Sequence, residues 1–166
     1  MSTMTTTELP TEVEVDAAQL GRLLTQGGFA EVTVRSLETG NYVCLTFSAK
    51  KRGEHGGLMP RNTLAGRVGL NDADVVFIDR QRDMMSSFSP RTGEVRHTRA
   101  STAATRWTVE KLLSWITGGY PLDQQAQVLV ATRCARCGRK LRDPISLERG
   151  MGPECYGRPT GSVAAR

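Results

Sequence analysis

The chain has 166 residues, 39% hydrophobic and 23% charged, which excludes a disordered chain and fits one domain with room for a small metal-bound module. No apolar run approaches the ~20 residues that span a bilayer, and no basic-then-apolar leader is visible, so neither a membrane segment nor a secretory signal is expected. The net charge is +5, and we expect a cytoplasmic location, where cysteines stay reduced.

The N-terminal region predicts a leader followed by a helix. Residues 1–12 are polar and predict a flexible segment. Apolar residues at helical spacing then follow Asp16, a candidate N-cap, and end at the pair Gly27 and Gly28. Because Asp favours the start of a helix and Gly its end, this pattern predicts a helix between them.

A β-hairpin is predicted next. Apolar residues alternate with polar ones on both sides of a Glu-Thr-Gly-Asn turn at residues 38–41. On the second strand, the alternation places Cys44 on the face opposite to Val43 and Leu45. Residues 50–62 are rich in Gly and charge and predict a loop.

The second half of the chain predicts further strands and two helices. Residues 75–79, VVFID, are an apolar run suited to a buried strand, and residues 82–99 predict a second hairpin with its turn at 89–93. Residues 105–119 carry an apolar stripe that predicts the strongest helix. A shorter helix is expected over residues 121–132, running directly into a cysteine-bearing tail.

These elements predict an α+β fold. We expect a small mixed domain with two β-hairpins and two or three helices over residues 13–131, and a zinc-knuckle-like module over residues 132–158. Residues 159–166 predict a disordered tail. The order of strands in the sheet cannot be derived from the sequence.

Three of the four cysteines lie in that tail with the spacing C-x2-C-x17-C: Cys134, Cys137 and Cys155. Two thiolates two residues apart on a tight turn can bind one tetrahedral ion, and Gly138 permits the turn. The alternatives are a thioredoxin-like redox pair, in which the third cysteine has no role, and inert buried thiols in a segment that is very polar. The pattern favours Zn²⁺.

A closed zinc site has four ligands, and the tail supplies three cysteines. The candidates for the fourth ligand are Cys44, His55, His97, Asp143, Glu148, Glu154 or a water molecule. A water would make metal-assisted hydrolysis conceivable, but no pairing of Glu with His stands nearby in the sequence to serve as a general base. A structural metal is therefore the favoured interpretation.

The stretch CxxCGRxLxDPxSxxRGxGPxC, residues 134–155, resembles the C-terminal cysteine module of a family of small bacterial and bacteriophage proteins of unknown function, common in actinobacteria and their phages. The resemblance implies metal binding and a phage-like setting, with the cytoplasm of a bacterium or of a phage host as the compartment. It also implies a helical lead-in over residues 107–131. The family pattern itself shows three cysteines.

The basic surplus lies on the cysteine tail. Residues 133–166 hold eight Lys/Arg and three Asp/Glu, whereas residues 1–132 hold fourteen of each. Such a concentration suits a polyanion, most simply nucleic acid. The candidate phosphate-binding residues are Arg133, Arg136, Arg139, Lys140, Arg142, Arg149 and Arg158, with Lys50, Lys51 and Arg52 as an extension and Tyr156 as a base-stacking candidate.

Two other functions remain open. The first is a protein–protein adaptor or inhibitor that binds a host enzyme or complex through the zinc module. The second, an enzyme, is the least favoured, because the chain has no Gly-rich phosphate loop, no H-E-x-x-H and no G-x-S-x-G. The acidic residues that would serve such a site as divalent-metal ligands are Asp72, Asp74, Asp79 and Asp83.

Overall fold

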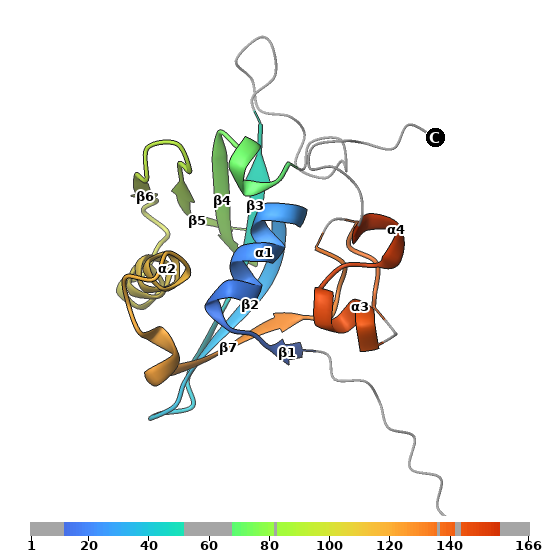
Figure 1. The fold of residues 1–166 in the computed structure, drawn as a ribbon. Coiled ribbons are helices and arrows are strands. Elements are labelled where there is room, and N and C mark those ends of the chain that lie inside the picture. Colours follow the sequence, from blue (N-terminus) through green and yellow to red (C-terminus); the bar gives the residue numbers. More distant parts are fainter. Residues whose placement is uncertain (1–11, 52–67, 82, 136, 142–143, 157–166) are drawn as a thin grey trace, which may run out of the picture.

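The computed structural model describes residues 12–51, 68–81, 83–135, 137–141 and 144–156. The elements follow in the order β1 (Glu12–Glu14), α1 (Ala17–Gly27), β2 (Phe29–Ser36), β3 (Tyr42–Lys50), η2 (Leu70–Asp72), β4 (Val75–Arg80), β5 (Asp83–Phe88), β6 (Val95–His97), α2 (Ala103–Ile116), η3 (Leu122–Gln124), β7 (Ala126–Ala131), α3 (Pro144–Arg149) and α4 (Pro153–Tyr156), where η marks a 3₁₀-helix. The fold is mixed α+β, as predicted (Figure 1). No helix within the described ranges is long and apolar enough to cross a membrane.

The seven strands form one antiparallel sheet in the order β1-β7-β2-β3-β4-β5-β6. Both predicted hairpins are present, as β2–β3 and β5–β6. Strand β7, late in the chain, lies between β1 and β2, with Val130 opposite both Val13 and Val32. This insertion brings the chain that leads into the cysteines next to the N-terminal strands.

Helix α1 begins and ends where the sequence predicts. Asp16 and Gln19 form a reciprocal capping box, with side-chain-to-backbone distances of 2.7 and 2.8 Å. Gly28 ends the helix with φ +69°, and a Cβ there would meet the carbonyl oxygen of Val68. Glycine is therefore required at the position where the chain turns from α1 into β2.

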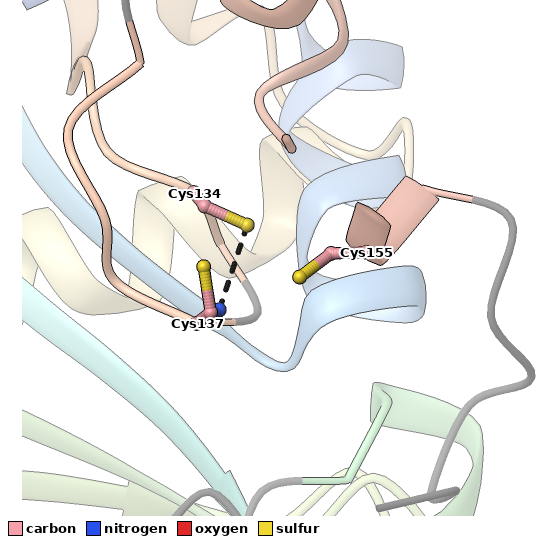
Figure 2. Close-up of side chains that lie close together, drawn as sticks. All are labelled: Cys134, Cys137 and Cys155. Carbon is pink, nitrogen blue, oxygen red and sulfur yellow. Dashed lines mark hydrogen bonds between the residues drawn. The ribbon is translucent and has the colours of Figure 1, made fainter. Parts of the chain in front are cut away.

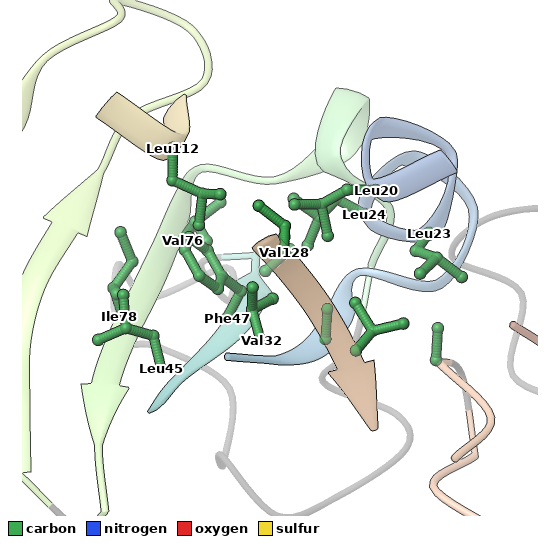
Figure 3. Close-up of a cluster of buried hydrophobic side chains, with 14 of the residues drawn as sticks. Leu20, Leu23, Leu24, Val32, Leu45, Phe47, Val76, Ile78, Leu112 and Val128 are labelled. Atoms are coloured by element: carbon green, nitrogen blue, oxygen red, sulfur yellow. The ribbon is translucent and has the colours of Figure 1, made fainter. Parts of the chain in front are cut away.

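Helices α1 and α2 cover one face of the sheet. Figure 3 shows Leu20 and Leu112 from these helices above Phe47 and Ile78 of the sheet, and all four side chains are fully buried. Each buried side chain of this size contributes about 1.5–3 kcal/mol relative to exposure, so this face accounts for much of the stability. The alternation of β3 holds as predicted, because Cys44 is exposed on the opposite face.

Two local predictions were wrong. Residues 121–132 hold η3 and β7 instead of a helix, because Val128 and Val130 alternate with Gln127 and point their side chains into the core. Lys50, expected in a loop, is the last residue of β3 and is fully buried, so it cannot extend an exposed basic surface. Of the predicted 50–62 loop, all but the first two residues lie outside the described ranges.

The cysteine-bearing segment packs against the C-terminal end of α1. Its residues Cys134, Ala135 and Met151 belong to the same buried cluster as the core of the sheet, and Figure 1 places α3 and α4 beside α1. A Cβ on Gly27 would lie 2.6 Å from Cβ of Ala135 and 2.8 Å from its carbonyl carbon. The close contact between this helix and the cysteine segment therefore depends on the absence of a side chain at residue 27.

Replacing Gly27 with Ala tests this contact. We expect Gly27→Ala to lower the free energy of unfolding by about 1–3 kcal/mol, because the new methyl group overpacks against the backbone of Ala135. Gly21→Ala in the same helix is the matched control, since its Cβ would meet only Ile116 at 3.6 Å. That control should gain up to about 1 kcal/mol from helix propensity. Urea unfolding of both variants measures the difference, and equal effects would contradict the packing argument.

Candidate metal centre

The first two cysteines lie on a tight hairpin that continues from β7. Arg133 and Lys140 pair as an antiparallel bridge, and the Cys134 N–H donates to the carbonyl of Arg139 at 2.8 Å. At the tip, the Gly138 N–H donates to the carbonyl of Cys134 at 2.9 Å, and Gly138 has φ +77°. This left-handed turn, which glycine adopts readily, brings Cys137 back over Cys134.

The third cysteine arrives from α4, after the chain has passed through α3. The Ala135 N–H donates to the carbonyl of Gly150 at 2.9 Å, which ties the end of α3 to the hairpin. The Cys155 N–H donates to the carbonyl of Gly152 at 3.1 Å. Figure 2 shows the three side chains pointing toward one another, and their sulfur atoms all lie within 4.8 Å.

The three sulfurs fit a metal ion such as zinc. A Zn–S bond of about 2.3 Å in a tetrahedral site places the sulfur ligands about 3.8 Å apart. Contraction by no more than about 1 Å would therefore bring all three into bonding distance. The Cys137 N–H also donates to Sγ of Cys134 at 3.5 Å, a contact that stabilises negative charge on the sulfur.

Without a cation, Cys155 favours the protonated thiol. Burial raises the pKa of the Cys155 thiol from 9.0 to about 12, and the proximity of Cys134 and side-chain hydrogen bonds to Cys137 and Cys134 add to the rise. A divalent cation among the sulfurs reverses this preference, because thiolates are its ligands and its charge offsets theirs. Cys134 and Cys155 are buried, so the cluster is largely shielded from water.

Among the described residues, none of the distant candidates for a fourth ligand joins the group. Cys44 lies on the open face of the sheet, with Sγ 3.4 Å from Oγ1 of Thr33. His97 is held by Oγ of Ser86 at 2.7 Å and a carboxylate oxygen of Glu110 at 2.9 Å. Glu154 is exposed and outside the group; His55, Asp143 and the side chain of Glu148 lie outside what the structure describes.

The acidic residues proposed for an enzymatic metal site do not form a group of three within the described ranges. Asp74 instead accepts a hydrogen bond from Arg91 at 3.1 Å. Asp72 lies in η2, Asp79 in β4 and Asp83 at the start of β5. Within the described ranges, the three cysteines are the group of side chains that could hold a metal ion.

Four of the predicted basic residues are described and exposed in the cysteine-bearing segment. Arg133, Arg139, Lys140 and Arg149 are exposed. Arg136, Arg142, Arg158 and Arg52 lie outside the described ranges. Lys51, the residue after β3, is exposed.

Sequence reasoning missed two features of the site. The sequence indicates Gly27 only as a helix stop, although Ala135 also packs directly against its backbone. The guanidinium of Arg149 lies 4.1 Å from the ring centroid of Tyr156, a stacking contact between the ends of α3 and α4. A spacing of seven residues across two short helices carries no recognisable signal for such a contact.

The fold and the site define a mixed α+β protein with a three-cysteine cluster that can hold a metal ion such as zinc. Residues 125–160 match the model of a family of unknown function, DUF6011. The match begins one residue before β7. Of the helical lead-in that the resemblance implied over residues 107–131, the part up to Ile116 is helix α2, whereas residues 126–131 form strand β7. No curated protein and no solved structure matches the chain significantly.

The metal prediction can be tested with serine variants. We expect the reduced wild-type protein to bind one zinc ion per chain, and Cys137→Ser to lose it, because two sulfurs hold the ion far less tightly than three. Cys44→Ser is the matched control and should retain zinc, since Cys44 lies outside the cluster. Native mass spectrometry gives the stoichiometry. Full retention of zinc by Cys137→Ser would refute the site.

The raised pKa of Cys155 predicts how the metal-free protein responds to alkali. The folded state holds the Cys155 proton more tightly than the unfolded state does. The protonated thiol therefore contributes to the free energy of unfolding in full below pH 9.0, and this contribution is lost as the pH rises toward about 12. Metal-free wild type should therefore lose thermal stability above about pH 9 more steeply than metal-free Cys155→Ser. Circular dichroism melting curves measure this. Parallel curves for the two proteins would contradict the assigned cause.

Proposed function

We propose that this is a non-enzymatic zinc-binding protein whose basic C-terminal module, residues 132–158, binds nucleic acid. The observation that carries the proposal is that the basic surplus lies in the part of the sequence that holds the three clustered cysteines. Residues 133–166 hold eight Lys/Arg against three Asp/Glu, and the rest of the chain is balanced. Phosphate groups are the commonest biological partners of such a surface.

Zinc has a structural role in this proposal. The segment from Arg133 to Tyr156 is rich in charge and glycine, and its buried apolar side chains are few, chiefly Leu141 and Met151. A metal ion bound by three thiolates would hold the hairpin against α4 and keep the surrounding cations in fixed positions. Its sulfurs are largely buried, which favours a scaffold over a reactive centre.

The arrangement of cations supports a polyanionic partner. Arg133 and Lys140 lie directly opposite each other in the bridge, and both are exposed. Like charges facing each other across a strand pair destabilise it. A bound phosphate chain would offset this repulsion, and Arg139, the preceding residue in the chain, is also exposed. These contacts provide affinity without reading the base sequence.

A protein–protein adaptor is the second candidate. The side chain of Ile145 on α3 is 59% exposed, which places an apolar group on the same module as the cations. A partner protein would cover such a residue. A single exposed isoleucine is common on protein surfaces, so charge remains the stronger observation.

The two candidates separate in a binding experiment with labelled single-stranded DNA, duplex DNA and RNA at several salt concentrations. We expect the zinc-loaded protein to bind at low salt and to weaken steeply as salt rises. Arg139→Ala combined with Lys140→Ala should lower the magnitude of the slope of log K against log salt by about 2, because each lost phosphate contact removes about one unit. Fluorescence anisotropy measures both quantities.

The matched control carries Arg99→Ala and Arg106→Ala. Both arginines are exposed, and they lie just before and within α2, which Figure 1 shows on the opposite side of the molecule from α3 and α4. The control removes the same net charge from the side of the molecule opposite to the module, so it should bind almost as well as wild type if the contact lies on the module. An equal loss in both double variants would show that net charge alone matters. If the wild-type protein binds no nucleic acid at low salt, the protein–protein adaptor is the candidate function that remains.

A further inference from the structure

Arg149 and Tyr156 form a stacked pair at the surface of the module. The guanidinium carbon of Arg149 lies 4.1 Å from the centroid of the Tyr156 ring. Arg149 is exposed, and Tyr156 retains 43% of its accessible surface. Among the described residues, Arg149 has no carboxylate partner, so the ring is the group that holds it.

Stacking orients the guanidinium without using its hydrogen-bond donors. The guanidinium carbon lies over the face of the Tyr156 ring, and this cation–π contact uses none of the five N–H donors of the arginine in a conventional hydrogen bond. These donors form a fork that matches two oxygens of one phosphate. An arginine already held in position loses less side-chain freedom on binding than a free one. The pair is thus preorganised for a bidentate anion contact.

The cysteine cluster positions both halves of the pair. Tyr156 follows Cys155 directly, and the N–H groups of both donate to the carbonyl of Gly152, at 3.0 and 3.1 Å. Arg149 precedes Gly150, whose carbonyl accepts the Ala135 N–H at 2.9 Å. Arg149 is therefore next to Gly150, which is hydrogen-bonded to the hairpin, and Tyr156 is next to Cys155. A metal ion at the cluster would fix the distance between α3 and α4 on which the stack depends.

We propose that Arg149, held over the ring of Tyr156, binds one backbone phosphate of nucleic acid through a bidentate contact, and that a metal ion at the cysteine cluster would keep this pair assembled. The inference rests on the proposed function and names one specific phosphate contact within it. Arg139 and Lys140 then act as charges without a required geometry, because no described aromatic ring holds either of them. Replacing Arg149 with another cationic residue should therefore weaken binding more than the same replacement at Arg139.

Substitutions that keep the charge test this difference in the full-length, zinc-loaded protein. Arg149→Lys should weaken binding of labelled single-stranded DNA about tenfold while leaving the salt slope unchanged, because lysine retains the charge and loses the planar fork. Arg139→Lys is the matched control and should bind within about twofold of wild type. Arg149→Ala should also lower the salt slope by about one unit. Fluorescence anisotropy provides the affinities.

Tyrosine variants test the stack from its other side. Tyr156→Phe keeps the ring and should bind like wild type, whereas Tyr156→Leu removes it and should weaken binding to the level of Arg149→Lys. Zinc content, measured for each variant, shows that the cluster is intact. Wild-type binding with an unchanged affinity for Arg149→Lys would overturn the phosphate fork and leave the proposed function standing. Absence of wild-type binding at low salt would instead overturn both.

Discussion

The convergence of three thiols at one buried point is the constraint on which the cysteine module depends. Their sulfur atoms lie within 4.8 Å of one another, and two of the three cysteines are almost fully buried. Burial and the proximity of the other cysteines raise the pKa of the Cys155 thiol, whereas a divalent ion requires thiolate ligands. This geometry disfavours a free Cys155 thiolate and suits a bound cation. A cation would also stabilise a segment that has few buried apolar residues.

The module is built into the core of the sheet. Strand β7 runs directly into the hairpin of Cys134, and Ala135 packs on Gly27 at the end of α1. Leu141 and Met151 join the same cluster of buried side chains as the sheet. A disturbance at the metal centre would therefore reach α1 and β7 through packed atoms, since close-packed interiors transmit displacement.

The cysteine module carries two kinds of exposed cation. Arg133 and Lys140 are brought together by the hairpin as opposed like charges, whereas Arg149 is held by an aromatic ring. The first arrangement favours any polyanion and weakens with salt. The second favours a ligand that presents two oxygens to the planar guanidinium, as a phosphate does. Nucleic acid satisfies both requirements, and this combination is the reason to prefer it over a protein partner whose acidic residues are dispersed.

The sequence by itself determined the local features: helix α1 between Asp16 and Gly28, both hairpins, and the three cysteines as one candidate ligand set. Each depends on capping, alternation or ligand spacing, which act over a few residues. Only the tertiary structure decided that β7 is a strand between β1 and β2, that Lys50 is buried, and that Arg149 meets Tyr156. A short apolar run is compatible with either a helix or a strand, and the outcome depends on neighbours more than ninety residues away in the chain. Contacts between distant segments leave no local pattern, because the free energy that selects them comes from burial in the folded protein.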